Sequence, residues 1–86
     1  MEFVYIIQHS LTKEIYIGKT KNLQQRLNEH NRGKQSATKR KIGEWIPVYL
    51  EIYRNKKDAD TREARLKKHG RAKQELLKRI KESLLS

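Results

Sequence analysis

The sequence has 86 residues, a formal net charge of +11 and a hydrophobic fraction of 35%, which predicts one domain over residues 1–86 with a core too small to enclose a deep small-molecule pocket. No apolar stretch approaches the roughly 20 residues of a membrane-spanning helix. The absence of cysteine excludes disulfides and thiolate metal sites, which fits a reducing compartment, so we expect a cytoplasmic protein. The excess of Lys and Arg favours a polyanionic partner such as DNA, with an anionic membrane surface as the less favoured alternative.

The first two predicted elements are β-strands. Residues 3–8 are almost entirely apolar and rich in β-branched and aromatic side chains, which is typical of a strand covered on both faces. A polar loop at residues 10–14 follows, and Ile15 to Lys19 are predicted to form the returning strand. The residue that faces Tyr16 depends on the turn type, so the pattern leaves the register open.

A short helix is predicted next. Asn22 is a suitable N-cap with Gln25 as its capping-box partner, and Gly33 is a natural residue to end the helix after Arg32. Two aliphatic and two polar side chains form a stripe at helical spacing, so they are expected along the edge of the face that packs on the sheet. The four residues of this stripe are Leu23, Arg26, Leu27 and His30.

A third strand is predicted at residues 48–53, after a basic loop at residues 33–44. Pro47 can lie only at the start of this strand or on a sheet edge. Alternation places two sets of side chains on opposite faces, one expected in the core and the other amphipathic. The expected core set is Val48, Leu50 and Ile52, and the amphipathic set is Tyr49, Glu51 and Tyr53.

Two helices are predicted in the last third of the chain. Asp58 can cap a helix that runs through Lys68 and is broken at Gly70, and a final helix begins near Arg71. The inward stripe of the first is Ala59, Glu63 and Leu66, and that of the second is Ala72, Leu76, Leu77, Ile80 and Leu84. These elements predict an α/β (α+β) domain, in which helices flank a three-stranded antiparallel sheet.

An acid on an inward helix stripe is the first candidate for chemistry. Hydrolysis of a phosphodiester needs an activated water and neutralised charge on the phosphoryl oxygens, and a metal ion can supply both. Carboxylates favour hard cations such as Mg²⁺, which need only one or two protein carboxylates. Glu63 is therefore a candidate metal ligand. The alternative is an ordinary helix charge that pairs with Arg62 or Lys67.

Arg26 and His30 likewise each have a functional and a structural interpretation. The Arg26 guanidinium can present its planar fork of donors to a phosphate, or it can form an i,i+3 ion pair with Glu29. A histidine beside an apolar stripe, such as His30, is by itself typical of a packed and hydrogen-bonded residue. No chemistry is assigned to four further rings, which are His9, Tyr49, Tyr53 and His69.

The two strand motifs of the hairpin resemble those of the GIY-YIG endonuclease family. Phe3-Val4-Tyr5 stands where that family has Gly-Ile-Tyr, Tyr16-Ile17-Gly18 spells the second motif literally, and the resemblance covers nearly the whole chain. It implies endonucleolytic cleavage of DNA with Mg²⁺ or Mn²⁺, leaving 5′-phosphate and 3′-hydroxyl ends. Two departures are Phe3 in place of the first glycine and the lack of any asparagine after Asn55, where larger members carry one after the metal-binding acid.

The resemblance also implies a role for each residue of the candidate site. Tyr5 would activate the attacking water, Tyr16 would position water or phosphate beside it, and His30 would pass the proton onward. Arg26 would bind the phosphate and Glu63 the metal ion.

Contacts to the DNA backbone follow from the same resemblance. Glycine in the second motif lets a backbone or the DNA approach closely, and the Thr-Lys pair of the basic loop resembles a Ser/Thr-Lys stretch of small stand-alone members. The implied contacts are Gly18, Lys19, Lys34, Thr38, Lys39 and Arg40. We expect a monomer with low sequence specificity, and selectivity for nicked or branched DNA is left open. The alternative is a non-catalytic nucleic-acid-binding module or a decayed nuclease, against which the inward Glu63 argues.

Overall fold

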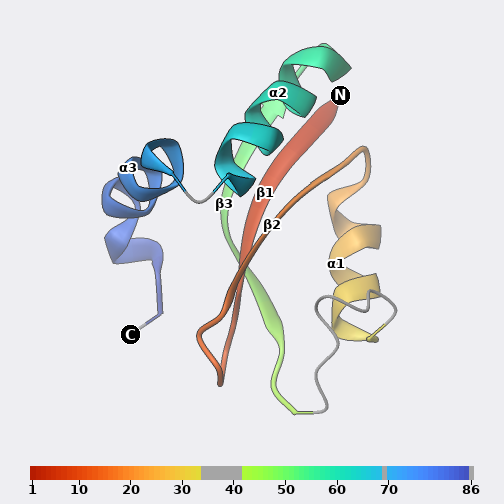
Figure 1. Cartoon of the computed structure of the whole chain (residues 1–86). Helices are drawn as coiled ribbons and strands as arrows, with labels where there is room; N and C mark the ends of the chain where they lie inside the picture. Colours follow the sequence, from red (N-terminus) through yellow and green to blue (C-terminus); the bar gives the residue numbers. More distant parts are fainter. Residues whose placement is uncertain (34–41, 69, 86) are drawn as a thin grey trace.

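The computed structural model describes residues 1–33, 42–68 and 70–85. Within these residues the chain forms an α+β fold, with an antiparallel sheet of strand order β2-β1-β3 and helices around it (Figure 1). The elements are β1 (Glu2–His9), β2 (Ile15–Thr20), α1 (Leu23–Asn31), β3 (Trp45–Tyr53), α2 (Lys56–Lys67), α3 (Arg71–Arg79) and the 3₁₀ turn η2 (Lys81–Ser83). The predicted fold class is confirmed.

β1 is the central strand, and its pairing determines which side chains meet. Tyr5 lies opposite Gly18 of β2, and Ile7 lies opposite Tyr16. Because side chains alternate along a strand, Tyr5, Ile7 and Tyr16 point to the same face of the sheet. Every residue of β1 except Phe3 is buried, which confirms the prediction of a strand covered on both faces.

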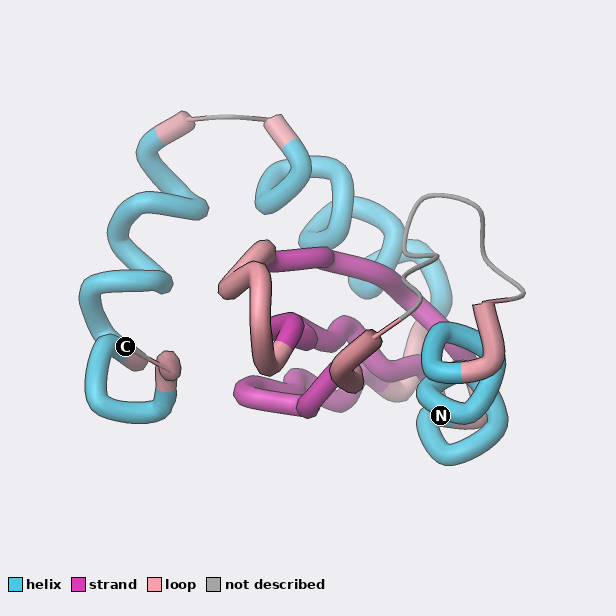
Figure 2. Tube along the Cα trace, turned by 90° about the horizontal axis from the view of Figure 1, so that it is seen from below, coloured by secondary structure: helices cyan, strands magenta, loops and turns pink. Residues whose placement is uncertain are grey.

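α2 and α3 cover one face of the sheet. Figure 2 shows α2 along the strands, with α3 and α1 at opposite sides of them. Ala59 and Leu66 of α2 are completely buried, as their inward position in the sequence pattern predicts. The core on this side consists of Val4, Ile6, Ile17, Ala59, Leu66 and Leu76.

A charged cluster ties α2 to β3. The Glu51 carboxylate accepts a hydrogen bond of 2.6 Å from the hydroxyl of Tyr49 and another of 2.6 Å from that of Tyr53, and Arg62 donates to it through Nε and Nη2, each at 2.9 Å. Although burial acts in the opposite direction, these hydrogen bonds hold the pKa of the Glu51 carboxyl below its ordinary value. The cluster anchors α2 to the sheet at the residue that directly precedes Glu63.

α1 packs on the opposite face. Its N-cap is Asn22, as predicted, and the Asn22 side chain accepts a hydrogen bond of 3.0 Å from the backbone N–H of Gln25. Leu23 and Leu27 of the predicted stripe pack on a second, smaller core cluster. That cluster consists of Tyr5, Ile7 and Trp45.

β3 begins earlier than predicted, at Trp45 instead of Val48. The side chain of Asn31, at the end of α1, holds this start by accepting a hydrogen bond of 2.6 Å from the Trp45 N–H and donating one of 3.3 Å to its carbonyl oxygen. Pro47 lies opposite Ile7. β3 is an edge strand, which agrees with the predicted edge position of Pro47.

The predicted core face of β3 is wrong at Leu50 and Ile52. These two side chains are 39% and 57% exposed, whereas Tyr49 and Tyr53 pack on the core beneath α2 and α3. Val48 does pack on this core, because a register shift opposite Ile6 and Ile7 interrupts the alternation. From Tyr49 to Tyr53 the alternation was predicted correctly, but the pattern does not say which face a helix will cover. The tyrosines tolerate the covered side because their hydroxyls have Glu51 as an acceptor.

The start of α2 and the end of α3 differ from the prediction. Asn55, and not Asp58, is the N-cap of α2, since its side chain accepts a hydrogen bond of 2.8 Å from the Lys57 N–H. Asp58 lies instead in the first turn, where a negative charge favours the helix. α3 begins at Arg71 as predicted, but Leu84 lies beyond its end. No described helix has the length and apolar character needed to cross a membrane.

Candidate functional site

Three rings from three elements meet on the α1 side of the sheet. Tyr5 of β1 lies 6.4 Å from Tyr16 of β2 and 5.8 Å from His30 of α1, measured between ring centroids, and Tyr16 and His30 are 5.0 Å apart. A hydrogen bond of 2.8 Å joins the Tyr5 hydroxyl to His30 Nε2. The structure therefore brings together the two tyrosines and the histidine that the sequence predicted for one site.

Gly18 makes room for Tyr5. The two residues face each other across β1 and β2, and a Cβ at position 18 would collide with the ring and hydroxyl of Tyr5. Gly18 does not have a positive φ, so its role rests on the absence of a side chain and not on the conformational freedom of glycine. The space that the sequence assigned to DNA is occupied on this side by the Tyr5 ring.

Burial controls the protonation of the Tyr5–His30 pair. Each of the two side chains is 1% exposed. Burial raises the pKa of the Tyr5 phenol well above its ordinary value, and Tyr16 adds to this effect while Arg26 opposes it. Burial also lowers the pKa of His30, and Arg26 acts in the same direction. At neutral pH both groups are therefore uncharged.

Arg26 borders the ring cluster from α1. Its Nε lies 3.1 Å from Glu29 Oε1, so the ion pair that was the alternative interpretation of this residue is present. The guanidinium is nevertheless near enough to the Tyr5 phenol to act on its pKa. Arginine has five N–H donors, and those not used by Glu29 can serve a phosphate beside Tyr5.

Glu63 of α2 is linked to the ring cluster through Lys67. Its carboxylate forms an ion pair of 3.3 Å with Lys67 Nζ, and this nitrogen lies 5.6 Å from the centroid of the Tyr16 ring. The same carboxylate acts on the Tyr5 phenol, whose raised pKa is due first to burial and then to Tyr16, with a smaller contribution from Glu63. Of the five residues predicted from the sequence, Tyr5, Tyr16 and His30 are in ring contact, and the charges of Arg26 and Glu63 act on the Tyr5 phenol.

The donor set near Tyr16 suits one kind of metal ion. The described residues contain no group of three or more His, Cys, Asp or Glu side chains that could hold a metal ion together, so they do not form a zinc site of several protein ligands. Mg²⁺ differs, because it keeps several of its waters and binds to one or two carboxylates together with substrate phosphates. The partly buried Glu63 carboxylate fits such an ion.

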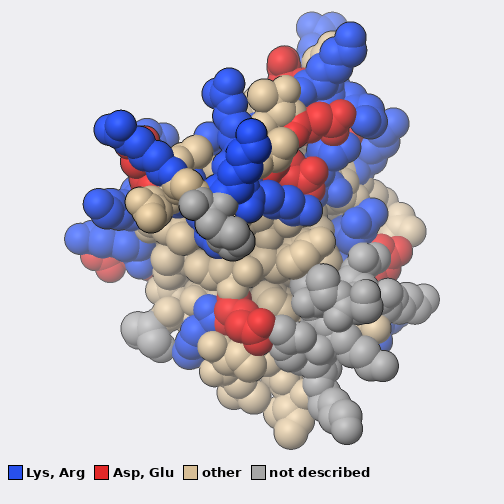
Figure 3. All heavy atoms as spheres, viewed as in Figure 1, with Lys and Arg blue, Asp and Glu red and all other residues tan. Residues whose placement is uncertain are grey.

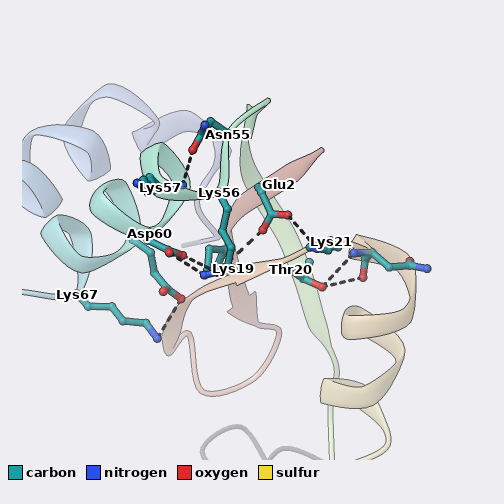
Figure 4. A network of polar contacts seen from close by, with 11 residues as sticks. Glu2, Lys19, Thr20, Lys21, Asn55, Lys56, Lys57, Asp60 and Lys67 are labelled. Atoms are coloured by element: carbon teal, nitrogen blue, oxygen red, sulfur yellow. Dashed lines mark hydrogen bonds and ion pairs between the residues drawn. The ribbon is translucent and has the colours of Figure 1, made fainter.

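Lys19, another predicted DNA contact, lies outside the ring cluster. Lys19 points to the face opposite Tyr16, where its Nζ is 2.6 Å from Asp60 Oδ1 and 4.0 Å from Glu2 Oε1 (Figure 4). Its side chain is only 19% exposed, so a DNA contact by Lys19 stays a prediction that competes with these ion pairs. Four predicted contacts lie outside the described residues, namely Lys34, Thr38, Lys39 and Arg40.

A basic surface on α2 and α3 was not predicted. Lys and Arg side chains gather over these helices in Figure 3. On α2, α3 and the residues that directly follow them, several basic side chains are exposed and form no ion pair within the described parts of the chain. These residues are Lys57, Arg65, Lys68, Lys78, Arg79 and Lys81. The excess of basic over acidic residues at 56–81 was the only sequence signal for this surface.

Comparisons with known proteins agree with this geometry. A UPF0213 protein from Syntrophus aciditrophicus (strain SB) is 39% identical over 82 residues, which are 94% of this chain and 91% of that protein. A UPF0213 protein from Clostridium perfringens (strain 13 / Type A) is 38% identical over 68 residues, 79% of this chain and 72% of that protein. The solution NMR structure of a UPF0213 protein from Bacillus halodurans superimposes with a TM-score of 0.56 at 28% identity, over 94% of this chain and 86% of that one. Residues 1–78 match the family model described as the GIY-YIG catalytic domain, and the chain belongs to the GIY-YIG family.

Proposed function

We propose that this protein hydrolyses phosphodiester bonds of DNA with a divalent metal ion and with low sequence specificity. GIY-YIG domains are catalytic domains of nucleases that act on DNA. The observation that carries the proposal is the hydrogen bond between Tyr5 and His30, formed where Glu63 and Arg26 also act on the phenol. A module that only bound nucleic acid would gain nothing from a carboxylate here, because the carboxylate repels phosphates.

Tyr5 and His30 are suited to move a proton together. A free phenolate is unfavourable at neutral pH, since burial raises the pKa of Tyr5. A Tyr5 hydroxyl that gives its proton to His30 Nε2 while it takes one from the attacking water needs no free phenolate. Tyr16 is more exposed than Tyr5, so water and substrate would approach the pair past Tyr16.

Glu63 and Arg26 would help to neutralise the negative charge of the substrate phosphate, Glu63 through a bound metal ion and Arg26 directly. Glu63 would hold the Mg²⁺ or Mn²⁺ ion, which when bound neutralises charge on the phosphoryl oxygens and lowers the pKa of a bound water. Arg26 would donate to a phosphoryl oxygen from α1, using the part of its donor fork that Glu29 leaves open.

The basic surface on α2 and α3 supports DNA as the partner. Cations that form no ion pair in the described parts of the chain, such as Arg65 and Lys68, are available to phosphates. Phosphate contacts carry no sequence information, which supports low sequence specificity. Affinity for duplex DNA should therefore fall with salt, with each neutralised phosphate adding about −0.9 to the slope of log K against log salt. Binding that does not change with salt would contradict this part of the proposal.

The experiment that tests the proposal compares Glu63→Gln with Glu75→Gln. Both acids form i,i+4 ion pairs on helices, with Lys67 and Arg71, so the two substitutions remove the same charge from the same kind of pair. We expect Glu63→Gln to lower metal-dependent cleavage by at least about a hundredfold, as when a group that stabilises transition-state charge is lost. Glu75→Gln should cleave like the parent.

Nicked, branched and linear DNAs should be incubated with each protein, with and without Mg²⁺ or Mn²⁺. DNA affinity without metal should stay the same or rise in Glu63→Gln, because one negative charge leaves the candidate site. If the parent binds all of these DNAs and cleaves none of them, the non-catalytic binding module becomes the better interpretation. If Glu63→Gln is folded and cleaves as well as the parent, Glu63 is a structural acid.

A further inference from the structure

Lys67 occupies a position that the proposed mechanism does not use. Its Nζ lies near two groups of the candidate site, at 3.3 Å from Glu63 Oε2 and 5.6 Å from the centroid of the Tyr16 ring. The side chain is half-exposed. A positive charge over the face of a tyrosine is attracted by the ring quadrupole, so the ammonium is drawn toward the site by both neighbours.

This arrangement differs from the other i,i+4 ion pairs of the described residues. Lys56 pairs with Asp60, which also pairs with Lys19 on the face opposite Tyr16, and Arg71 pairs with Glu75 on α3. The Lys67 ammonium instead lies beside the one carboxylate of the candidate site that fits a divalent ion, and a hard cation needs the same carboxylate oxygens. The Lys67 ammonium and a divalent ion would therefore compete for the Glu63 carboxylate oxygens.

We propose that Lys67 is a tethered counter-cation of Glu63, which neutralises the carboxylate in the metal-free protein and competes with the divalent ion for it. The inference rests on the proposed function, in which Glu63 holds the metal. Its consequence is that DNA can approach the metal-free site without meeting an unpaired carboxylate. A second consequence is that the protein binds its metal more weakly than the Glu63 carboxylate would by itself.

The size of the competition follows from two contributions. Release of an exposed i,i+4 ion pair is worth about a factor of two in an equilibrium constant. Repulsion in water between an ammonium and a dication about 6 Å away is worth about a factor of ten. The first applies if the ammonium moves away when the ion binds, and the second if it stays nearby, so removal of the ammonium should tighten metal binding by about two- to tenfold.

The test is the affinity of the DNA-free protein for Mn²⁺, measured from the electron paramagnetic resonance signal of the free ion. Lys67→Gln should bind Mn²⁺ about two- to tenfold more tightly than the parent. Lys68→Gln removes the same charge from the adjacent exposed residue, which forms no ion pair in the described part of the chain, and should bind like the parent. Lys67→Arg, which keeps the charge, should also stay close to the parent.

The outcomes separate this inference from the proposed function. Equal Mn²⁺ affinity in Lys67→Gln and Lys68→Gln, with binding lost in Glu63→Gln, would overturn the role of Lys67 and leave the metal site intact. Weaker binding in Lys67→Gln would also overturn it, because Lys67 would then position Glu63 for the metal. If the parent and Glu63→Gln bind Mn²⁺ equally, the metal assignment under the proposed function fails, and this inference fails with it.

Discussion

Substitution of Gly18 by alanine should disturb the candidate site and the core together. The added Cβ would lie 2.9 Å from Tyr5 Cε2 and nearer still to Cζ and the hydroxyl oxygen, and real Cβ atoms do not tolerate such distances to ring atoms. Tyr5 is 1% exposed and has no open space into which to move. Overpacking of this kind costs about 1–3 kcal/mol in free energy of unfolding. For a domain of this size the melting temperature should fall by roughly 4–24 °C.

Urea unfolding followed by circular dichroism measures this cost, and two further variants control it. Gly70→Ala adds a Cβ whose nearest neighbour is the Lys68 carbonyl oxygen at 3.5 Å, so it should cost less than about 1 kcal/mol as a change at a helix N-cap. In a Tyr5→Leu background the Gly18→Ala cost should drop by at least about 0.5 kcal/mol, because the two sites are in contact. A Gly18→Ala variant as stable as the parent, or one with the same cost in both backgrounds, would refute the reasoning.

Two further predictions concern pH and the cluster beneath α2. The folded state lowers the pKa of His30 below its ordinary 6.5, so the stability that neutral His30 contributes is complete above pH 6.5 and is lost as the pH falls toward the folded pKa. Urea titrations at several pH values should show that the parent loses more stability than His30→Gln in that window. Parallel curves of unfolding free energy against pH would exclude this. Glu51→Gln should destabilise the fold by about 1–3 kcal/mol, because Arg62 loses its charged acceptor. That deficit should shrink in acid, as the parent carboxyl protonates at a pKa held below 4.5, and a deficit that is constant with pH would assign the effect to packing.

Much of the fold could be predicted because local signals and burial agreed. The apolar run of β1, the Asn22 cap and the inward Ala59 and Leu66 each had one physical interpretation, and the structure confirms them. The covered face of β3 could not be predicted from alternation. It depends on the acceptor that Glu51 offers to two tyrosine hydroxyls and on Arg62 of a helix that is distant in the sequence.

The candidate site likewise has a part that could be predicted from the sequence and a part that could not. Tyr5, Tyr16 and His30 were predicted to lie together, and their ring contacts place them together. The function of Gly18 as space for Tyr5 depended on the strand register, which the turn left open. Lys67 was visible only as an i,i+4 partner of Glu63, since its second neighbour, Tyr16, lies on another element.

Trp45 is the only tryptophan of the chain, and its position makes it an optical reporter. It is buried in the same core cluster as Tyr5, its ring lies 5.2 Å from that of His9, and Asn31 binds both of its backbone groups. Its emission therefore responds to the sheet face beneath α1, whereas far-ultraviolet dichroism averages over all helices. A difference between the unfolding transitions followed by Trp45 emission and by dichroism would show, without any label, whether the core cluster around Tyr5 unfolds before the rest of the molecule.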